Sequence, residues 1–149
     1  MSLTEFKRSY AYTIEQDLIW GDMDAFQHLN NVAYFRLFET IRIAYFQTLG
    51  VLDIMKESGI GPILHSTNCR YRIPLTFPDT LTLGIRVTRI ESDRYHLDHG
   101  VYSNQQSDLA ANGDACIVCF NYKSNEKSSV PRGLVERILK FQDNYPPIT

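Results

Sequence analysis

The chain has 149 residues, of which 44% are hydrophobic and 21% are charged, a composition typical of a globular protein rather than a disordered one. Its net charge of −2 and pI near 6.1 give no global reason to expect nucleic acid as a partner. No apolar run is long enough to span a membrane, and the start MSLTEFKRSY lacks the apolar segment of a signal peptide. We therefore expect a single cytoplasmic domain that covers residues 1–149.

The first half of the chain predicts one strand and one long helix. Residues 9–19 (SYAYTIEQDLI) have a strand-like pattern. From residue 31, apolar residues recur at three- and four-residue spacing until Gly50, a typical residue at a helix end. The apolar face of this helix is wide, so we expect it to be buried against a curved sheet. Residues 51–61 are predicted to be a connector with a short helical turn.

The second half predicts a sheet followed by a short helix. Runs with two-residue alternation predict strands at residues 62–73, 80–90, 95–103 and 110–122. Polar residues fit turns at 91–94 and 104–108 and a solvated loop at 123–129. An amphipathic helix is predicted at 131–142. Strands joined by hairpins pair antiparallel, so we expect an α+β domain in which a curved antiparallel sheet wraps around one long central helix, with a short C-terminal helix. An unpaired edge strand would favour dimerisation.

Polar residues are concentrated just before the central helix. Asp22, Asp24, His28, Asn30 and Asn31 lie where the unpaired N–H groups and the positive end of the helix dipole collect. A carboxylate beside such donors can attack a thioester carbonyl or activate water, while the N–H groups stabilise the oxygen that gains charge. The alternative is structural, because Asp and Asn are common helix caps.

The motifs GDMD and HLNNVAY, together with the order of the elements, resemble the hotdog-fold acyl-CoA thioesterases, in the branch that includes the 4-hydroxybenzoyl-CoA thioesterases. The resemblance implies acyl-CoA hydrolysis without a cofactor, with Asp24 as nucleophile or general base. It implies an oxyanion hole at the start of the central helix, formed by the N–H of Asn31 with that of Asn30 or Val32. It also implies a homodimer or homotetramer whose pockets lie between subunits.

His28 could hydrogen-bond the substrate carbonyl, orient Asp24 or protonate the departing thiol, and a purely structural role in the loop is an equal alternative. Substrate contacts are expected from residues near the helix start and on the strand that commonly lines the acyl pocket in this fold: Asn30, Tyr34, His65, Ser66 and Thr67. Aromatic pocket walls are expected from Phe26, Tyr34, Phe38 and Tyr45. Coenzyme A carries phosphates, and the candidate cations are Arg70, Arg72, Arg89, Arg94, Lys123 and Arg132.

Other ionisable residues are expected to be structural. Asp22 should hold the loop through backbone N–H groups. Glu39 lies about 12 Å along the helix from Asn31, so pairing with Arg36 or Arg42 is preferred to a catalytic role.

The cysteines and two of the histidines do not predict a metal site. Without an export signal, the odd number of cysteines favours free thiols, and we expect all of them (Cys69, Cys116 and Cys119) to be buried and structural. Cys116 and Cys119 lie three apart in a strand, as do His96 and His99, so each pair should point to opposite faces.

Two other functions stay open from the sequence alone. One is hydration or dehydration of an acyl thioester, although the acid and base residues of that activity are not recognisable. The other is a domain that binds an acyl thioester without cutting it, against which the presence of Asp24 argues. Acyl carrier protein could also replace coenzyme A as the carrier.

Overall fold

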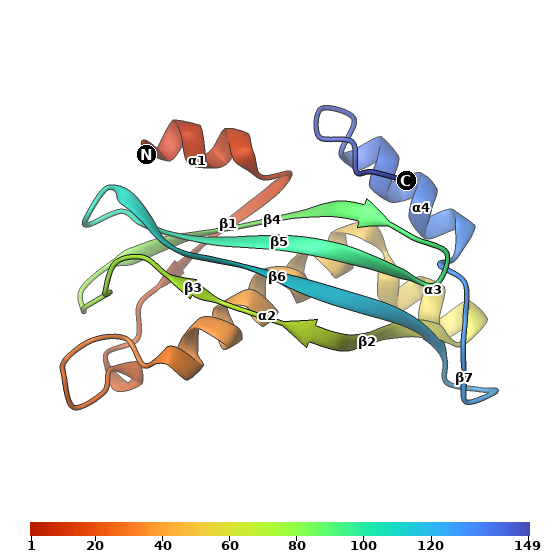
Figure 1. Cartoon of the computed structure of the whole chain (residues 1–149), viewed down its shortest axis with the longest axis horizontal. Helices are drawn as coiled ribbons and strands as arrows, with labels where there is room; N and C mark the ends of the chain where they lie inside the picture. The colour runs from red at the N-terminus through yellow and green to blue at the C-terminus, as the bar shows by residue number, and fades with distance from the viewer.

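Strand β6 pairs with more strands than any other in the structure, a computed structural model that describes residues 1–149 (Figure 1). It pairs antiparallel with β5, β2, β3 and β7, and the main strand order is β1-β4-β5-β6-β2. The strands are β1 (Tyr12–Asp17), β2 (Ile60–Thr67), β3 (Arg70–Tyr71), β4 (Thr80–Ile90), β5 (Arg94–Ser103), β6 (Asp108–Asn121) and β7 (Glu126–Lys127). The α-helices are α1 (Leu3–Ser9), α2 (Asn31–Leu49), α3 (Val51–Ser58) and α4 (Arg132–Phe141), with a 3₁₀ turn, η1, at Trp20–Asp22.

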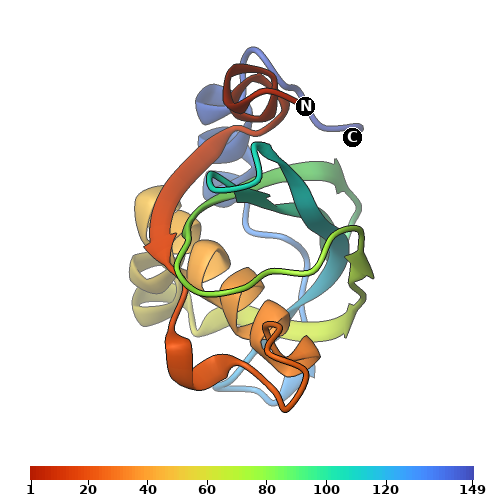
Figure 2. The ribbon, with the colours of Figure 1, turned by 90° about the vertical axis from the view of Figure 1, so that its left-hand side faces the viewer.

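Helix α2 lies inside the curve of the sheet, as the end-on view in Figure 2 shows. Its residues Phe38, Ile41 and Tyr45 are at most 1% exposed and belong to one cluster of 27 buried residues that also includes Leu83 of β4 and Leu97 of β5. Truncating a fully buried side chain costs about 2–5 kcal/mol, so packing fixes the position of α2 more than helix propensity does. The predicted hotdog fold is confirmed.

Glycine ends α2 and starts the next helix. Gly50 has φ 74°, a left-handed conformation that favours glycine, and α3 begins at the following residue. Residues 51–61 were predicted to be a connector with one helical turn, but they form the full helix α3 and the start of β2. The apolar residues Val51 and Ile54 pack on the core, which extends the turn into a helix.

The first strand was predicted at residues 9–19, and its start was wrong. Strand β1 begins only at Tyr12, and helix α1 precedes it. Helix α1 starts with a capping box in which the Ser2 hydroxyl accepts from the Glu5 N–H and the Glu5 carboxylate accepts from the Ser2 N–H. Phe6 anchors the helix in a small cluster with Tyr102. Only two of its seven residues, Leu3 and Phe6, are apolar, which gives little helical periodicity, so the sequence pattern did not predict α1.

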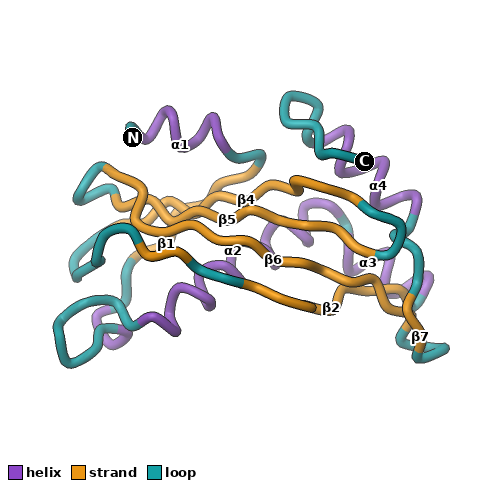
Figure 3. The backbone as a smooth tube through the Cα atoms, in the orientation of Figure 1, coloured by secondary structure: helices purple, strands orange, loops and turns teal.

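The predicted strand at 62–73 is interrupted, as the tube in Figure 3 shows between β2 and β3. His65 is the unpaired residue of a β-bulge in β2, since Leu64 pairs with Ile117 and Ser66 with Cys116. The chain then crosses β6 closely at Gly113, where a Cβ atom would collide with the carbonyl oxygen of Asn68. This crossing turns the residues after 69 toward the start of α2. The loop predicted at 123–129 also contains the short strand β7.

The prediction that His96 and His99 point to opposite faces is confirmed, and the prediction of three buried cysteines is confirmed for Cys116 and Cys119. His99 is fully buried, whereas His96 bonds Glu91 on the outer face of the sheet at 2.7 Å, so the pair does diverge. The three cysteines are free, but Cys69 is only half-buried, because it lies at the interruption between β2 and β3. No helix is long and apolar enough to cross a membrane.

Three charged residues face one another on the outer side of the sheet. Arg86 pairs with Asp98 across β4 and β5, and Asp98 pairs with Asp114 across β5 and β6. The nearest Arg86–Asp98 distance is 3.7 Å, and the Asp98 side chain is 20% exposed. Burial raises the pKa of Asp98 from 3.8 to about 6, with Asp114 adding to the increase and Arg86 opposing it.

We expect Asp98→Asn to stabilise the protein at alkaline pH. The folded state binds the Asp98 proton more tightly than the unfolded state does, so ionisation of Asp98 costs stability as the pH rises from about 4 to 6. The variant should gain about 1–2 kcal/mol in free energy of unfolding at pH 8 and almost nothing at pH 4. Urea unfolding at both pH values measures the difference, and an equal gain at both would contradict this account.

Candidate active site

The loop before α2 is held by its own backbone hydrogen bonds. The Asp24 N–H donates to the His28 carbonyl at 2.8 Å, and the Asn30 N–H donates to the Asp22 carbonyl at 2.9 Å. Leu29 is buried and its N–H donates to the Leu75 carbonyl at 2.7 Å, which attaches the loop to the segment after β3. The polar residues of the loop therefore have fixed positions relative to the start of α2.

Asp24 is held by one of its two carboxylate oxygens. Its Oδ1 accepts from the Phe26 N–H at 2.8 Å and from the His28 N–H at 3.4 Å. Its Oδ2 makes no hydrogen bond within the protein, and the residue is exposed. Asp24 therefore caps a turn of the loop rather than the helix, and one carboxylate oxygen is left to act on another molecule.

Asn30 is the cap of α2. Its side-chain oxygen accepts from the Val32 N–H at 3.1 Å, and its carbonyl accepts from the Ala33 N–H at 2.9 Å. The N–H groups of Asn30 and Val32 are thus engaged, which argues against their predicted part in an oxyanion hole. The Asn31 N–H is left at the helix start, where no residue of the helix can accept from it.

A hollow of about 350 Å³ joins Asp24 to the start of α2. It is lined by Asp24, His28, Leu29, Asn31, Tyr34, Tyr71, Arg72, Ile73 and Pro74. Four predicted residues of the loop and helix therefore share one site. Arg72 was among the candidate cations, but Tyr71, Ile73 and Pro74 were not predicted, because an uninterrupted strand would not have turned toward α2.

Two tyrosines form one wall of the hollow. The rings of Tyr34 and Tyr71 meet edge to face with centroids 4.9 Å apart, and the Tyr71 hydroxyl donates to the Asn31 carbonyl at 3.3 Å. Burial raises the pKa of Tyr34 to about 12, so its phenol stays neutral at physiological pH. Tyr71 thus connects β3 directly to the first turn of α2.

Asp22 has a different partner from the one predicted. Its carboxylate accepts from Arg36 Nη2 at 2.8 Å, rather than from backbone N–H groups of the loop. The Arg36 side chain is 62% exposed, so the pair contributes at most about 1 kcal/mol to stability. The geometric effect matters more here, because the pair attaches the loop to the second turn of α2.

The predicted ion pair of Glu39 is absent. Arg36 binds Asp22, and Arg42 is buried, with Nη1 3.4 Å from Nε2 of His99. Burial and the Arg42 charge lower the pKa of His99 to about 3, so the imidazole is neutral and accepts from the guanidinium. Glu39 is left exposed on the outer side of α2.

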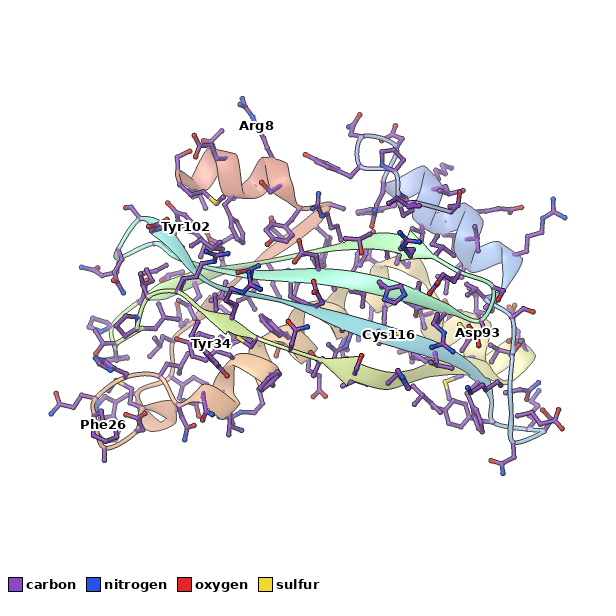
Figure 4. All side chains as sticks on the ribbon, viewed as in Figure 1. Arg8, Phe26, Tyr34, Asp93, Tyr102 and Cys116 are labelled. Carbon is purple, nitrogen blue, oxygen red and sulfur yellow. The ribbon has the colours of Figure 1, made fainter.

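Several predicted binding residues do not line this hollow. His65, Ser66 and Thr67 are exposed on β2. Phe38 and Tyr45 are buried in the core, and the side chain of Phe26 projects from the tip of the loop, 82% exposed (Figure 4). Of the candidate cations, only Arg72 lines the hollow, and its Nε donates to Asn112 Oδ1 at 2.8 Å. No group of His, Cys, Asp and Glu side chains is placed to hold a metal ion.

Comparison with known proteins identifies relatives along most of the chain. Residues 18–138 match the thioesterase-like superfamily. The long-chain acyl-CoA thioesterase FadM of Escherichia coli (strain K12) is 21% identical over 116 residues, which cover 78% of this chain and 88% of FadM.

Solved structures share the fold. The PA5185 protein of Pseudomonas aeruginosa strain PAO1 has a TM-score of 0.77 at 25% identity, covering 89% of this chain and 92% of that one. A thioesterase from Thermus thermophilus, complexed with coenzyme A and Zn, has a TM-score of 0.78 at 22% identity, covering 90% of this chain and 96% of that one.

The residues that match the superfamily include the loop with Asp24, all of α2 and the segment after β3. These are the parts that build the hollow described above. The chain therefore belongs to the thioesterase-like superfamily, and it is a thioester hydrolase.

Proposed function

We propose that the protein hydrolyses acyl-CoA to a carboxylic acid and coenzyme A, with Asp24 as nucleophile or general base. The observation that carries this proposal is the single hollow lined by Asp24 and by the start of α2. A thioester needs a positioned carboxylate and an N–H donor for the carbonyl oxygen, and the lining of this hollow by Asp24 and Asn31 supports these two roles.

The two carboxylate oxygens of Asp24 differ in their hydrogen bonds, and we propose different roles for them. Oδ1 is held by the loop N–H groups, so Oδ2 is the atom that would attack the thioester carbon or take a proton from water. The substrate carbonyl oxygen would then accept from the Asn31 N–H. In either route the C–S bond breaks, the sulfur leaves with the electron pair and is protonated, and water supplies the second oxygen of the acid.

Coenzyme A as the carrier is supported by Arg72. Asn112 fixes the guanidinium through its Nε, which leaves both Nη groups for a phosphate or a pantetheine oxygen. FadM is named as a long-chain acyl-CoA thioesterase, and the Thermus thermophilus structure contains coenzyme A, which also supports this carrier. His28 also lines the hollow, and its proposed role is to hydrogen-bond the substrate carbonyl or sulfur.

We also propose a homodimer, on the basis of strand β2. Residues 63–67 are exposed on both faces of this edge strand, and Ile63 and Leu64 are 37% and 45% exposed. A second copy that paired along this edge would cover them. It could also bring His65, Ser66 and Thr67 to the hollow of its partner, which they do not reach within one chain. Association of dimers into a tetramer is an extension of the same proposal.

The experiment that tests the proposed function measures thiol release from acetyl-, hexanoyl-, decanoyl-, palmitoyl- and benzoyl-CoA. We expect saturable release from at least one of them, with the free acid as the second product. The same acyl groups on acyl carrier protein show which carrier is preferred. Tight binding of acyl-CoA without thiol release would contradict the proposal and favour a binding domain, and loss of water from a hydroxyacyl thioester would favour a dehydratase.

A further inference from the structure

A second hollow also borders Asp24. It has a volume of about 530 Å³ and is lined by Trp20, Gly21, Met23, Asp24, Gln27, Thr76 and Phe77. Asp24 is the one residue that lines both hollows. A substrate whose reacting carbon lies at Asp24 would therefore border both hollows.

The walls of the second hollow are tied to each other. The sulfur of Met23 accepts from the Phe77 N–H at 3.4 Å and lies 3.7 Å from the Thr76 hydroxyl oxygen. The same hydroxyl donates to the Gln27 carbonyl at 3.0 Å. These contacts connect the loop before α2 to the segment between β3 and β4, so the hollow has a defined shape in the free protein.

The two hollows differ in charge. The first is lined by Arg72, by His28 and by Asn31, the residue whose N–H has no acceptor at the start of α2. The second has no charged side chain except Asp24, and its rim carries Trp20 and Phe77, which are 69% and 47% exposed. Large aromatic side chains exposed together on a protein surface commonly mark a binding site for apolar groups.

An acyl-CoA has the same division of charge about its thioester, with phosphates and amides on the sulfur side and hydrocarbon on the carbonyl side. We infer that the acyl chain lies in the Trp20–Phe77 hollow and that the coenzyme A arm lies over Tyr71 and Arg72. This inference rests on the proposed function. It makes Trp20 and Phe77 the residues that set acyl-chain preference, and it favours apolar acyl chains as the substrate class.

The inference predicts how rate depends on chain length. Each methylene that leaves water contributes up to about fourfold in binding, so kcat/KM should rise from acetyl- to decanoyl-CoA in the unchanged protein. In Trp20→Ala and Phe77→Ala the rise should flatten, with at least about a tenfold loss for decanoyl-CoA and less than threefold for acetyl-CoA. Steady-state thiol release over the series measures both slopes.

Two further variants make the test specific. Ile19→Ala removes a neighbouring apolar side chain that is 55% exposed and lines neither hollow, so its profile should match that of the unchanged protein. Arg72→Gln should raise KM by a similar factor for every chain length, because the coenzyme A arm is common to all of them. Light scattering on each variant checks that the assembly has not changed.

The outcomes separate the two proposals. Absence of thiol release from every acyl-CoA would overturn the proposed function itself. Thiol release with an unchanged chain-length slope in Trp20→Ala and Phe77→Ala would overturn only the assignment of the acyl hollow. If kcat/KM lost its dependence on chain length in Tyr71→Ala instead, the acyl chain would lie in the first hollow. A change in the mass of the assembly in Trp20→Ala would show that another subunit covers Trp20 and Phe77, which would also overturn the assignment.

Discussion

Replacing Asp24 by asparagine is expected to lower kcat for thioester hydrolysis by about 10³-fold. Asparagine retains an oxygen that can accept from the Phe26 N–H, so the turn of the loop should survive. It removes the negative charge and the basicity that attack on the thioester or on water requires. Thiol release under saturating substrate measures the loss, and thermal unfolding should show nearly the same Tm.

Asp22→Asn is the matched control for this variant. It makes the same chemical change two residues earlier and weakens the ion pair with Arg36, which attaches the loop to α2. We expect less than a tenfold fall in kcat, since Asp22 lines neither hollow. If Asp24→Asn kept activity within tenfold of the unchanged protein, the catalytic carboxylate would lie elsewhere, and Glu39 would be the next residue to replace.

The part of the site that lies within one short segment could be predicted from the sequence. Asp24, His28, Asn31 and Tyr34 span the loop and the first turn of α2, so local chain geometry brings them together. The long helix and the strands β4, β5 and β6 were predictable for a similar reason, because each has a sustained hydrophobic period.

The rest of the site depends on contacts between distant segments. Tyr71 and Arg72 reach the hollow only because the chain is interrupted after Thr67 and crosses β6 over Gly113. No periodicity in residues 62–73 predicts that interruption. The second hollow also depends on contacts between residues about fifty apart in sequence, through the Met23 sulfur. Helical spacing also predicted a wrong partner for Arg42. It suggested an ion pair with Glu39, but Arg42 is buried and contacts His99 instead.

Asn31→Pro is the second variant with a large expected effect, because it deletes one N–H group with little change to the helix. Proline is well tolerated at the first position of a helix, where the N–H has no partner within the helix. The residue before a proline must be extended, and Asn30 already has φ −60° and ψ 139°. The variant should therefore retain its fold while losing the proposed donor to the substrate carbonyl oxygen. Loss of one such donor costs about 10²–10³ in kcat.

Asn31→Ala separates the backbone N–H from the side chain. It retains the N–H group and removes the amide side chain, so we expect kcat within about tenfold of the unchanged protein. A fall of about 10²-fold or more in Asn31→Pro alone, with Tm values of both variants close to that of the unchanged protein, would identify the N–H as the catalytic donor. Equal falls in both variants would instead assign the effect to the Asn31 side chain. Full activity in Asn31→Pro would exclude this N–H from the oxyanion hole, and His28, which also lines the hollow, would be the next donor to replace.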